Sequence, residues 1–210
     1  MFGRAGAHFS GRRWQSVIGR LFADSRGVAA VEFALIVPLL LAMYFVTMEV
    51  AQAIETSKKV SRVGNMVADL VAQQPKITKL ELEAIMRIGE ATLQPYNRSQ
   101  PTIVLTAIEV TNDATPKIQV VWSHKLVDGT FSPGAAKEAP ITTLPPALVV
   151  KGSFLVRAEV SLGYAPVITW AASSKPTLGL AAAFDDIAMG ETYYLRPRMS
   201  TTIPCDGCNP

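Results

Sequence analysis

An apolar segment close to the N-terminus constrains this chain more than any other feature. Residues 28–48 read VAAVEFALIVPLLLAMYFVTM and contain one charged side chain, Glu32. About 20 apolar residues in a helix span the hydrocarbon core of a bilayer. Residues 1–27 precede this segment and hold five arginines and one aspartate, although the whole chain has a net charge of only +3. Because Lys and Arg are enriched on the cytoplasmic side of a span, we expect a single-pass membrane protein with its N-terminus in the cytoplasm.

A secretory signal peptide is a competing interpretation of the same segment. The residues Ala51-Gln52-Ala53 fit the small-residue pattern of a signal peptidase site, so cleavage there would leave Ile54 as the first residue. The apolar run is longer than the 7–15 residues usual for such signals. In addition, Glu49 stands just before the site. A membrane helix that stays in the mature protein is therefore the favoured interpretation.

The boundary between the basic leader and the apolar segment carries a further pattern. Gly27 ends the leader, and Glu32 is the fifth residue after it. A glycine lets a protease approach the backbone closely, because it has no side chain. An acidic residue inside a membrane helix is costly and marks a functional site by default. The simpler alternative is that Glu32 only complements the positive end of the helix dipole at the level of the lipid headgroups.

This pattern resembles the class III signal of type IV pilins and pseudopilins. More specifically, the run GVAAVEFALIVP from Gly27 to Pro38 is similar to the TadE/TadF pseudopilins of tight-adherence (Flp-type) pilus systems. The segment 193–198 and the closing cysteine pair are similar to those of longer TadE-like members. The resemblance is specific over residues 25–48 and rests on layout and length elsewhere. TadE and TadF are not distinguished by it.

The resemblance implies a structural role in pilus assembly rather than an enzymatic one. A prepilin peptidase would cut after Gly27, and the mature chain would begin at Val28. Glu32 and Phe33 would then set the register between subunits, with the new amine of a neighbouring Val28 as the partner of Glu32. Further partners would be the inner-membrane assembly platform, other pilins and membrane lipid. The alternative is an unprocessed, membrane-anchored periplasmic protein that acts as an envelope interaction module.

The remaining chain predicts an α+β domain outside the cytoplasm, attached to the membrane helix. Helical character continues over residues 49–74, and Pro38 is expected to kink the membrane part, because proline removes a backbone donor. A second helix is expected at residues 79–93, with Thr78 and Glu81 forming a capping box. The expected organisation is therefore a leader (1–27), a transmembrane part (28–48), its continuation (49–74) and a periplasmic domain (75–210).

Alternating apolar residues predict an antiparallel sheet that packs on these helices. The expected strands are residues 102–111, 118–123, 154–161 and 193–199, the last at an edge because it contains Pro197. In the second strand, Ile118, Val120 and Trp122 are expected to alternate with Gln119, Val121 and Ser123. Residues 128–147 are expected to form a long loop. Two apolar stretches, 167–170 and 178–184, have no assigned place.

Few residues in the chain are candidates for catalysis, metal binding or disulfide formation. Cys205 and Cys208 are expected to form a small structural disulfide outside the cytoplasm, with two free thiols as the alternative. His124 is expected at the surface or in a turn. We find no catalytic residues, no metal-ligand set and no phosphate- or dinucleotide-binding pattern, so we expect no cofactor. Because the basic charge is confined to the leader, nucleic-acid binding is not expected either.

Overall fold

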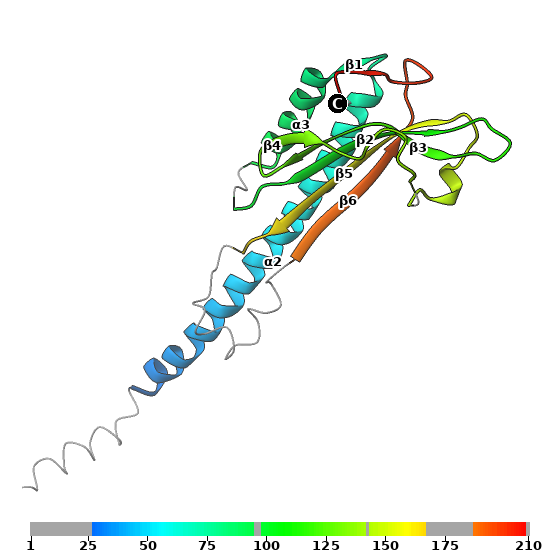
Figure 1. Cartoon of the computed structure of the whole chain (residues 1–210). Helices are drawn as coiled ribbons and strands as arrows, with labels where there is room; N and C mark the ends of the chain where they lie inside the picture. Colours follow the sequence, from blue (N-terminus) through cyan, green and yellow to red (C-terminus); the bar gives the residue numbers. More distant parts are fainter. Residues whose placement is uncertain (1–26, 95–97, 142, 167–186, 209–210) are drawn as a thin grey trace, which may run out of the picture. The chain divides into compact units, whose positions relative to one another are not determined.

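A computed structural model of the chain describes residues 27–94, 98–141, 143–166 and 187–208 (Figure 1). The chain divides into two units, one ending at Met48 and one beginning at Glu49. We call the second, residues 49–210, the C-terminal unit. The α+β class expected from the sequence is confirmed, because the described residues contain two α-helices and a five-stranded antiparallel sheet. The two apolar stretches at 167–170 and 178–184 lie outside the described residues.

Helix α2 spans Val28–Ala72 and includes both the apolar segment and its predicted continuation. In its C-terminal part the buried positions recur every three or four residues: Val60, Val63, Gly64, Val67, Ala68 and Val71. That spacing gives the helix one apolar face. Helix α3 spans Lys79–Thr92 and begins at the predicted capping box, in which Thr78 and Glu81 bond each other's backbone N–H groups. Both helices were thus predicted with boundaries correct to within two residues.

The sheet has the strand order β4-β3-β2-β5-β6, with every neighbouring pair antiparallel. Its strands are β2 (Thr102–Val110), β3 (Ile118–Val127), β4 (Thr130–Pro133), β5 (Phe154–Tyr164) and β6 (Ile187–Leu195). A separate two-stranded parallel sheet joins β1 (Ile77–Thr78) to β7 (Cys205–Asp206). The short parallel pair connects the start of α3 to the C-terminal part of the chain, and no sequence pattern predicted it.

The main core lies between the helices and one face of the sheet. Alternate residues of β5, from Phe154 to Tyr164, point into it, as predicted for this strand. Trp122 of β3 is also part of it, and its indole N–H donates to the carbonyl of Ile203 at 2.7 Å. A smaller core covers the other face, where the segment containing Ile141 and Leu144 packs on Ile108, Val110, Val120 and Leu155. The sheet is therefore a middle layer, buried on both sides at one end.

The predictions for two strands, β3 and β6, need correction. Val120 and Trp122 do not share a face, because the register with β2 shifts between Ala107 and Ile108 and leaves Val121 as an extra residue. Such a β-bulge moves the following side chains to the opposite face. The last strand begins earlier than predicted, at Ile187, and ends before Pro197, although it does lie at the edge of the sheet.

The expected long loop at 128–147 in fact begins with a tight hairpin. Asp128 and Gly129 both have positive φ values, of 47° and 72°, and connect β3 to β4. Two consecutive residues with positive φ form the turn whose twist matches that of the flanking strands, and Asp-Gly is a preferred sequence for it. The Asp-Gly pair was the sequence signal for this hairpin.

Candidate functional site: the start of helix α2

Gly27 lies directly before the first residue of α2 and is exposed. Its φ is not positive, since the described glycines with positive φ are Gly129, Gly152 and Gly207. A Cβ atom added at Gly27 would meet no described atom within 4 Å. Neither backbone conformation nor packing within the described residues therefore requires a glycine at this position.

Glu32 and Phe33 lie in the second turn of α2, and both are exposed, Phe33 to 69%. The next charged residue along the helix is Glu49, so the intervening turns carry no Asp, Glu, Lys or Arg. Among the described residues Glu32 has no ion-pair partner within the chain. The Glu32 carboxylate can therefore form an ion pair with a positively charged group of another molecule.

The apolar part of α2 is exposed along its length. Large side chains such as Val31, Leu35, Leu39 and Tyr44 are each more than half exposed. Within the described residues one helix, α2, is long and apolar enough to cross a membrane, with a mean hydropathy of 2.3 in its most apolar window. At 1.5 Å per residue, residues 28–48 extend for about 31 Å, close to the thickness of a bilayer core. The helix indicates single-pass membrane anchoring.

Pro38 lies inside α2, which continues on both sides of it. The helix is unbroken at Pro38, and the side chain of this residue is exposed. Further along, the hydroxyl of Thr47 donates to the carbonyl of Met43 at 2.8 Å, so the polar group that lies among apolar residues is satisfied within the helix. A membrane helix requires such internal satisfaction, because lipid offers no hydrogen-bonding partner.

Glu49 begins the C-terminal unit, and it had no predicted structural role beyond its position before the Ala51-Gln52-Ala53 pattern. Its side chain is 3% exposed, and its carboxylate accepts a hydrogen bond from the hydroxyl of Tyr164 at the end of β5. A buried carboxylate needs such partners, because its desolvation is costly. The available sequence signal was that Glu49 is the first charged residue after the apolar run.

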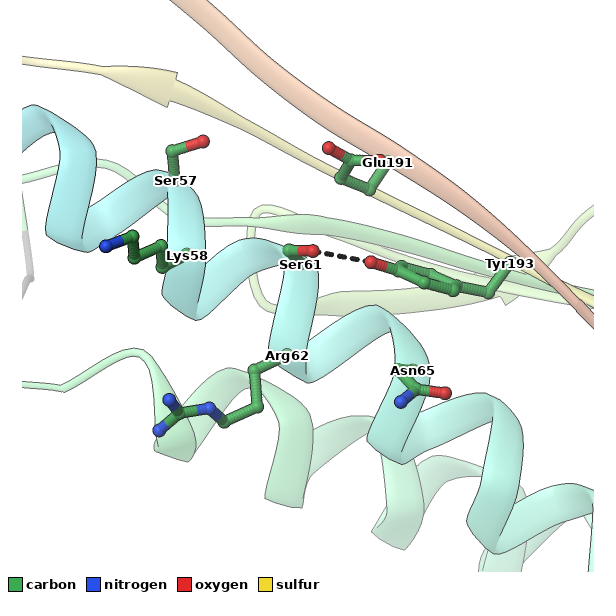
Figure 2. A pocket seen from close by; sticks show the side chains of 7 residues that line it. All are labelled: Ser57, Lys58, Ser61, Arg62, Asn65, Glu191 and Tyr193. Carbon is green, nitrogen blue, oxygen red and sulfur yellow. Dashed lines mark hydrogen bonds between the residues drawn. The ribbon is translucent and has the colours of Figure 1, made fainter.

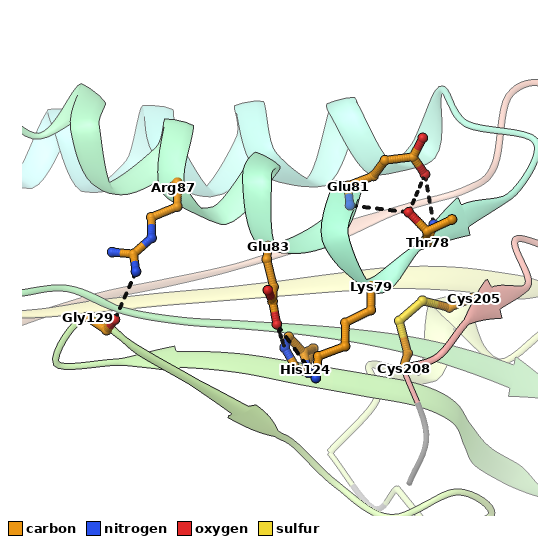
Figure 3. A network of polar contacts seen from close by, with 9 residues as sticks. All are labelled: Thr78, Lys79, Glu81, Glu83, Arg87, His124, Gly129, Cys205 and Cys208. Atoms are coloured by element: carbon orange, nitrogen blue, oxygen red, sulfur yellow. Dashed lines mark hydrogen bonds and ion pairs between the residues drawn. A yellow bond between two sulfur atoms is a disulfide. The ribbon is translucent and has the colours of Figure 1, made fainter.

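The structure joins Cys205 and Cys208 by a disulfide (Figure 3). Cys205 lies in β7 and pairs with Ile77 of β1, the strand directly before α3. Cys208 is almost fully buried in the main core. The hydrogen bond from Trp122 to Ile203 and the pairing of β7 with β1 attach the C-terminal segment to the rest of the unit, and the disulfide closes a short loop within that segment.

The prediction for His124 is wrong. The residue lies inside β3, is 1% exposed, and its Nε2 is 3.0 Å from a carboxylate oxygen of Glu83 on α3 (Figure 3). Phe131 of β4 stacks against the imidazole ring with centroids 6.1 Å apart. The strand extends to Val127 rather than ending before His124, so the side chain points toward α3. Within the described residues no cluster of three or more His, Cys, Asp or Glu side chains could hold a metal ion.

Comparison with known protein families finds a match over most of helix α2. The family model described as TadE-like protein matches residues 27–68, from the glycine before α2 into the buried part of that helix. The resemblance to TadE-like proteins noted from the sequence is therefore confirmed for this segment, and it associates the chain with pilus assembly. No curated protein and no solved structure matches the chain.

Proposed function

We propose that this protein is a minor pseudopilin that acts structurally in the assembly of tight-adherence pili. In this proposal a prepilin peptidase cuts after Gly27, and the mature chain begins at Val28. The observation that carries the proposal is Gly27 itself: an exposed glycine that the described fold does not require stands at the first position of the TadE-like match. A peptidase that must approach the backbone closely would explain why a glycine stands at this position.

Two charges would fix the position of each subunit along the filament. Cleavage creates a positively charged amine on Val28, and Glu32 of a neighbouring subunit offers the negative partner. Opposite charges attract strongly where water is excluded. The absence of other charges between Glu32 and Glu49 supports this role, because a displaced subunit would leave the carboxylate facing apolar side chains only. The contacts of this helix with others in lipid would depend on close packing.

The proposed orientation places the N-terminus in the cytoplasm of a bacterium and the C-terminal unit in the periplasm. The five arginines of the leader support the cytoplasmic N-terminus. The disulfide between Cys205 and Cys208 supports an oxidising compartment for the C-terminal unit, since disulfides persist there and are rare in the cytosol. The prepilin peptidase, the inner-membrane assembly platform and other pilins would be its partners, and it would catalyse no reaction.

Replacing Glu32 by Gln tests the assembly role. We expect the Glu32→Gln protein to accumulate in the membrane at the wild-type level and to be cleaved normally, yet to abolish or strongly reduce piliation. The measurement is a count of pili by electron microscopy in cells whose own copy of the gene is deleted. Glu55→Gln is the matched control, because Glu55 is an exposed acid on the same helix that pairs with Lys59 at 3.1 Å. Normal piliation with Glu32→Gln would contradict the proposed register.

A further inference from the structure

An open groove of about 430 Å³ lies between α2 and β6 in the C-terminal unit (Figure 2). Helix α2 contributes the side chains of one wall: Ser57, Lys58, Ser61, Arg62 and Asn65. Strand β6 contributes Glu191 and Tyr193 to the other wall. All seven side chains carry polar groups, so the groove is suited to a polar ligand.

The charged side chains of the groove are not neutralised by their surroundings. Lys58 and Arg62 are exposed and lie one helical turn apart. Within the described residues neither forms an ion pair, whereas the adjacent Lys59 is paired with Glu55. Glu191 on the opposite wall is also exposed and has no described ion pair. The groove thus offers two positive groups on the helix and one negative group on the strand.

Strand β6 lies at the edge of the sheet, so in the described part of the chain only β5 pairs with it. Residues 190–192 in its middle are exposed. An edge strand presents unpaired backbone N–H and C=O groups, which can pair with an added strand. Addition of an extended peptide to such an edge is a common mode of recognition.

The spacing along the helix matches the spacing along a strand. Lys58 and Arg62 lie four positions apart, which is about 6 Å along the helix axis. Side chains on one face of a strand recur every two residues, or about 6.7 Å. The hydrogen bond between Ser61 and Tyr193 holds the helix and the strand together at this point. Alternate side chains of an added strand can therefore meet successive turns of α2.

We propose that the edge of β6 and this groove bind an extended peptide segment of a partner protein. The segment adds to the sheet as a further strand, with an acidic side chain directed toward Lys58 and Arg62 and a basic side chain opposite Glu191. Opposite charges that face each other across neighbouring strands stabilise the pairing, and like charges oppose it. This inference goes beyond the proposed function, because it depends on neither the cleavage after Gly27 nor the role of Glu32.

A peptide fits the groove better than a glycan does. Tyr193 is the aromatic side chain of the groove, and its ring packs so closely on Gly64 that a Cβ atom there would lie 2.8 Å from the ring. Its hydroxyl is also engaged by Ser61. The ring is thus committed to packing within the protein and offers little stacking surface to a sugar, whereas the strand edge beside it remains suited to backbone pairing.

Peptide display against the full-length protein in lipid nanodiscs tests the proposal, with empty nanodiscs used to remove lipid-binding peptides. We expect enriched peptides to contain an acidic and a basic residue an even number of positions apart, because both side chains must lie on the face of the added strand that meets the groove. A synthetic copy of the best peptide should bind, and the same peptide with N-methyl groups on alternate backbone nitrogens should bind at least tenfold more weakly. N-methylation removes the donors that pair with a strand edge, so this comparison needs no variant of the protein.

Charge reversal of the groove provides the second comparison. Lys58→Glu with Arg62→Glu should weaken binding of the peptide at least tenfold and shift a repeated selection from acidic toward basic residues. The control is Lys117→Glu with Lys151→Glu, an equal charge change at two exposed positions that do not line the groove, which should leave the affinity unchanged. The proposal is overturned if selection shows no acidic preference, if the N-methylated peptide binds equally well, or if groove reversal leaves the affinity for the peptide unchanged.

Discussion

Gly89 shows how one missing side chain sets the distance between α3 and its neighbours. A Cβ atom at this position would lie 2.8 Å from Val67 on α2 and 3.2 Å from Ile103 on β2. A methyl group would therefore force a buried helix away from both the other helix and the sheet. The sequence predicted the helix that contains Gly89, but it did not indicate how closely the helix and its neighbours approach at this residue.

The replacement Gly89→Ala is expected to destabilise the protein. Overpacking of a buried site costs about 1–3 kcal/mol, and the better helix propensity of alanine offsets roughly 1 kcal/mol. We therefore expect a net loss of about 1 kcal/mol in the free energy of unfolding, measured by chemical denaturation in detergent. The control is Ile88→Ala at the neighbouring position, where the side chain is 50% exposed and should contribute less. An increase in stability with Gly89→Ala would contradict the close packing.

Glu81 makes the start of α3 sensitive to acid. The backbone N–H and the hydroxyl of Thr78 donate to its carboxylate and hold the pKa of Glu81 below its ordinary value of 4.5. A carboxyl group whose pKa is lowered by folding stabilises the folded state above the ordinary pKa. That contribution is lost as the pH falls through the lowered value.

We expect the melting temperature of the Glu81→Gln protein to lie below that of the wild type at neutral pH. The two melting temperatures should converge as the pH falls below 4.5 and through the lowered pKa of Glu81, because the wild-type side chain then becomes neutral like glutamine. Thermal melts followed by circular dichroism over a series of pH values provide the measurement. A difference that stays constant down to pH 3 would show that the ionised form of Glu81 is not what stabilises the helix start.

At the scale of elements, local sequence patterns predicted the structure correctly where a helix or strand buries mainly one of its faces. The continuation of α2 beyond the apolar segment, the start of α3 at its capping box and the alternating residues of β5 belong to elements that bury mainly one face. All three were predicted correctly. Strand β3 differs because it contributes to two cores. Ile118 and Val120 face the smaller core, and Trp122 faces the main one after the bulge at Val121. An alternating pattern carries no information about such a change of face.

The pairing of β1 with β7 could not be predicted either, because local sequence patterns do not show which distant segments meet. Each strand has two residues, and the pair joins segments that are far apart in the sequence. The same holds for the contact between His124 and Glu83, which depends on how α3 lies on the sheet. The cysteine spacing did suggest a disulfide, but the attachment of that segment to Trp122 through Ile203 needed the three-dimensional structure.

The C-terminal segment offers a prediction at the element scale. Replacing both Cys205 and Cys208 by Ser is expected to lower the free energy of unfolding by about 2 kcal/mol, the chain-entropy estimate for a very short disulfide loop. Chemical denaturation with and without reductant provides the measurement. The wild type should lose stability on reduction, and the double variant, as its own control, should not respond to reductant. Complete alkylation of both thiols in protein purified without reductant would contradict the disulfide.

At the scale of the whole molecule, the apolar part of α2 determines where the protein can reside. Its large side chains are exposed in the isolated chain, and such a long apolar surface is stable only when lipid or other helices cover it. Length and composition were sufficient to predict this segment from the sequence. The proposed roles of Gly27 and Glu32 came from the resemblance to TadE-like proteins. The family match supports that resemblance over residues 27–68.

The identity of the first residue of the mature protein tests the central claim most directly. The chain should be expressed together with the prepilin peptidase of its pilus system, purified from membranes and analysed by intact-mass and N-terminal mass spectrometry. We predict Val28 as the first residue, and predict that replacing Gly27 by Leu restores a chain beginning at Met1. A wild-type chain that begins at Met1 would contradict the account in favour of an unprocessed anchor, and one that begins at Ile54 would contradict it in favour of a secreted protein.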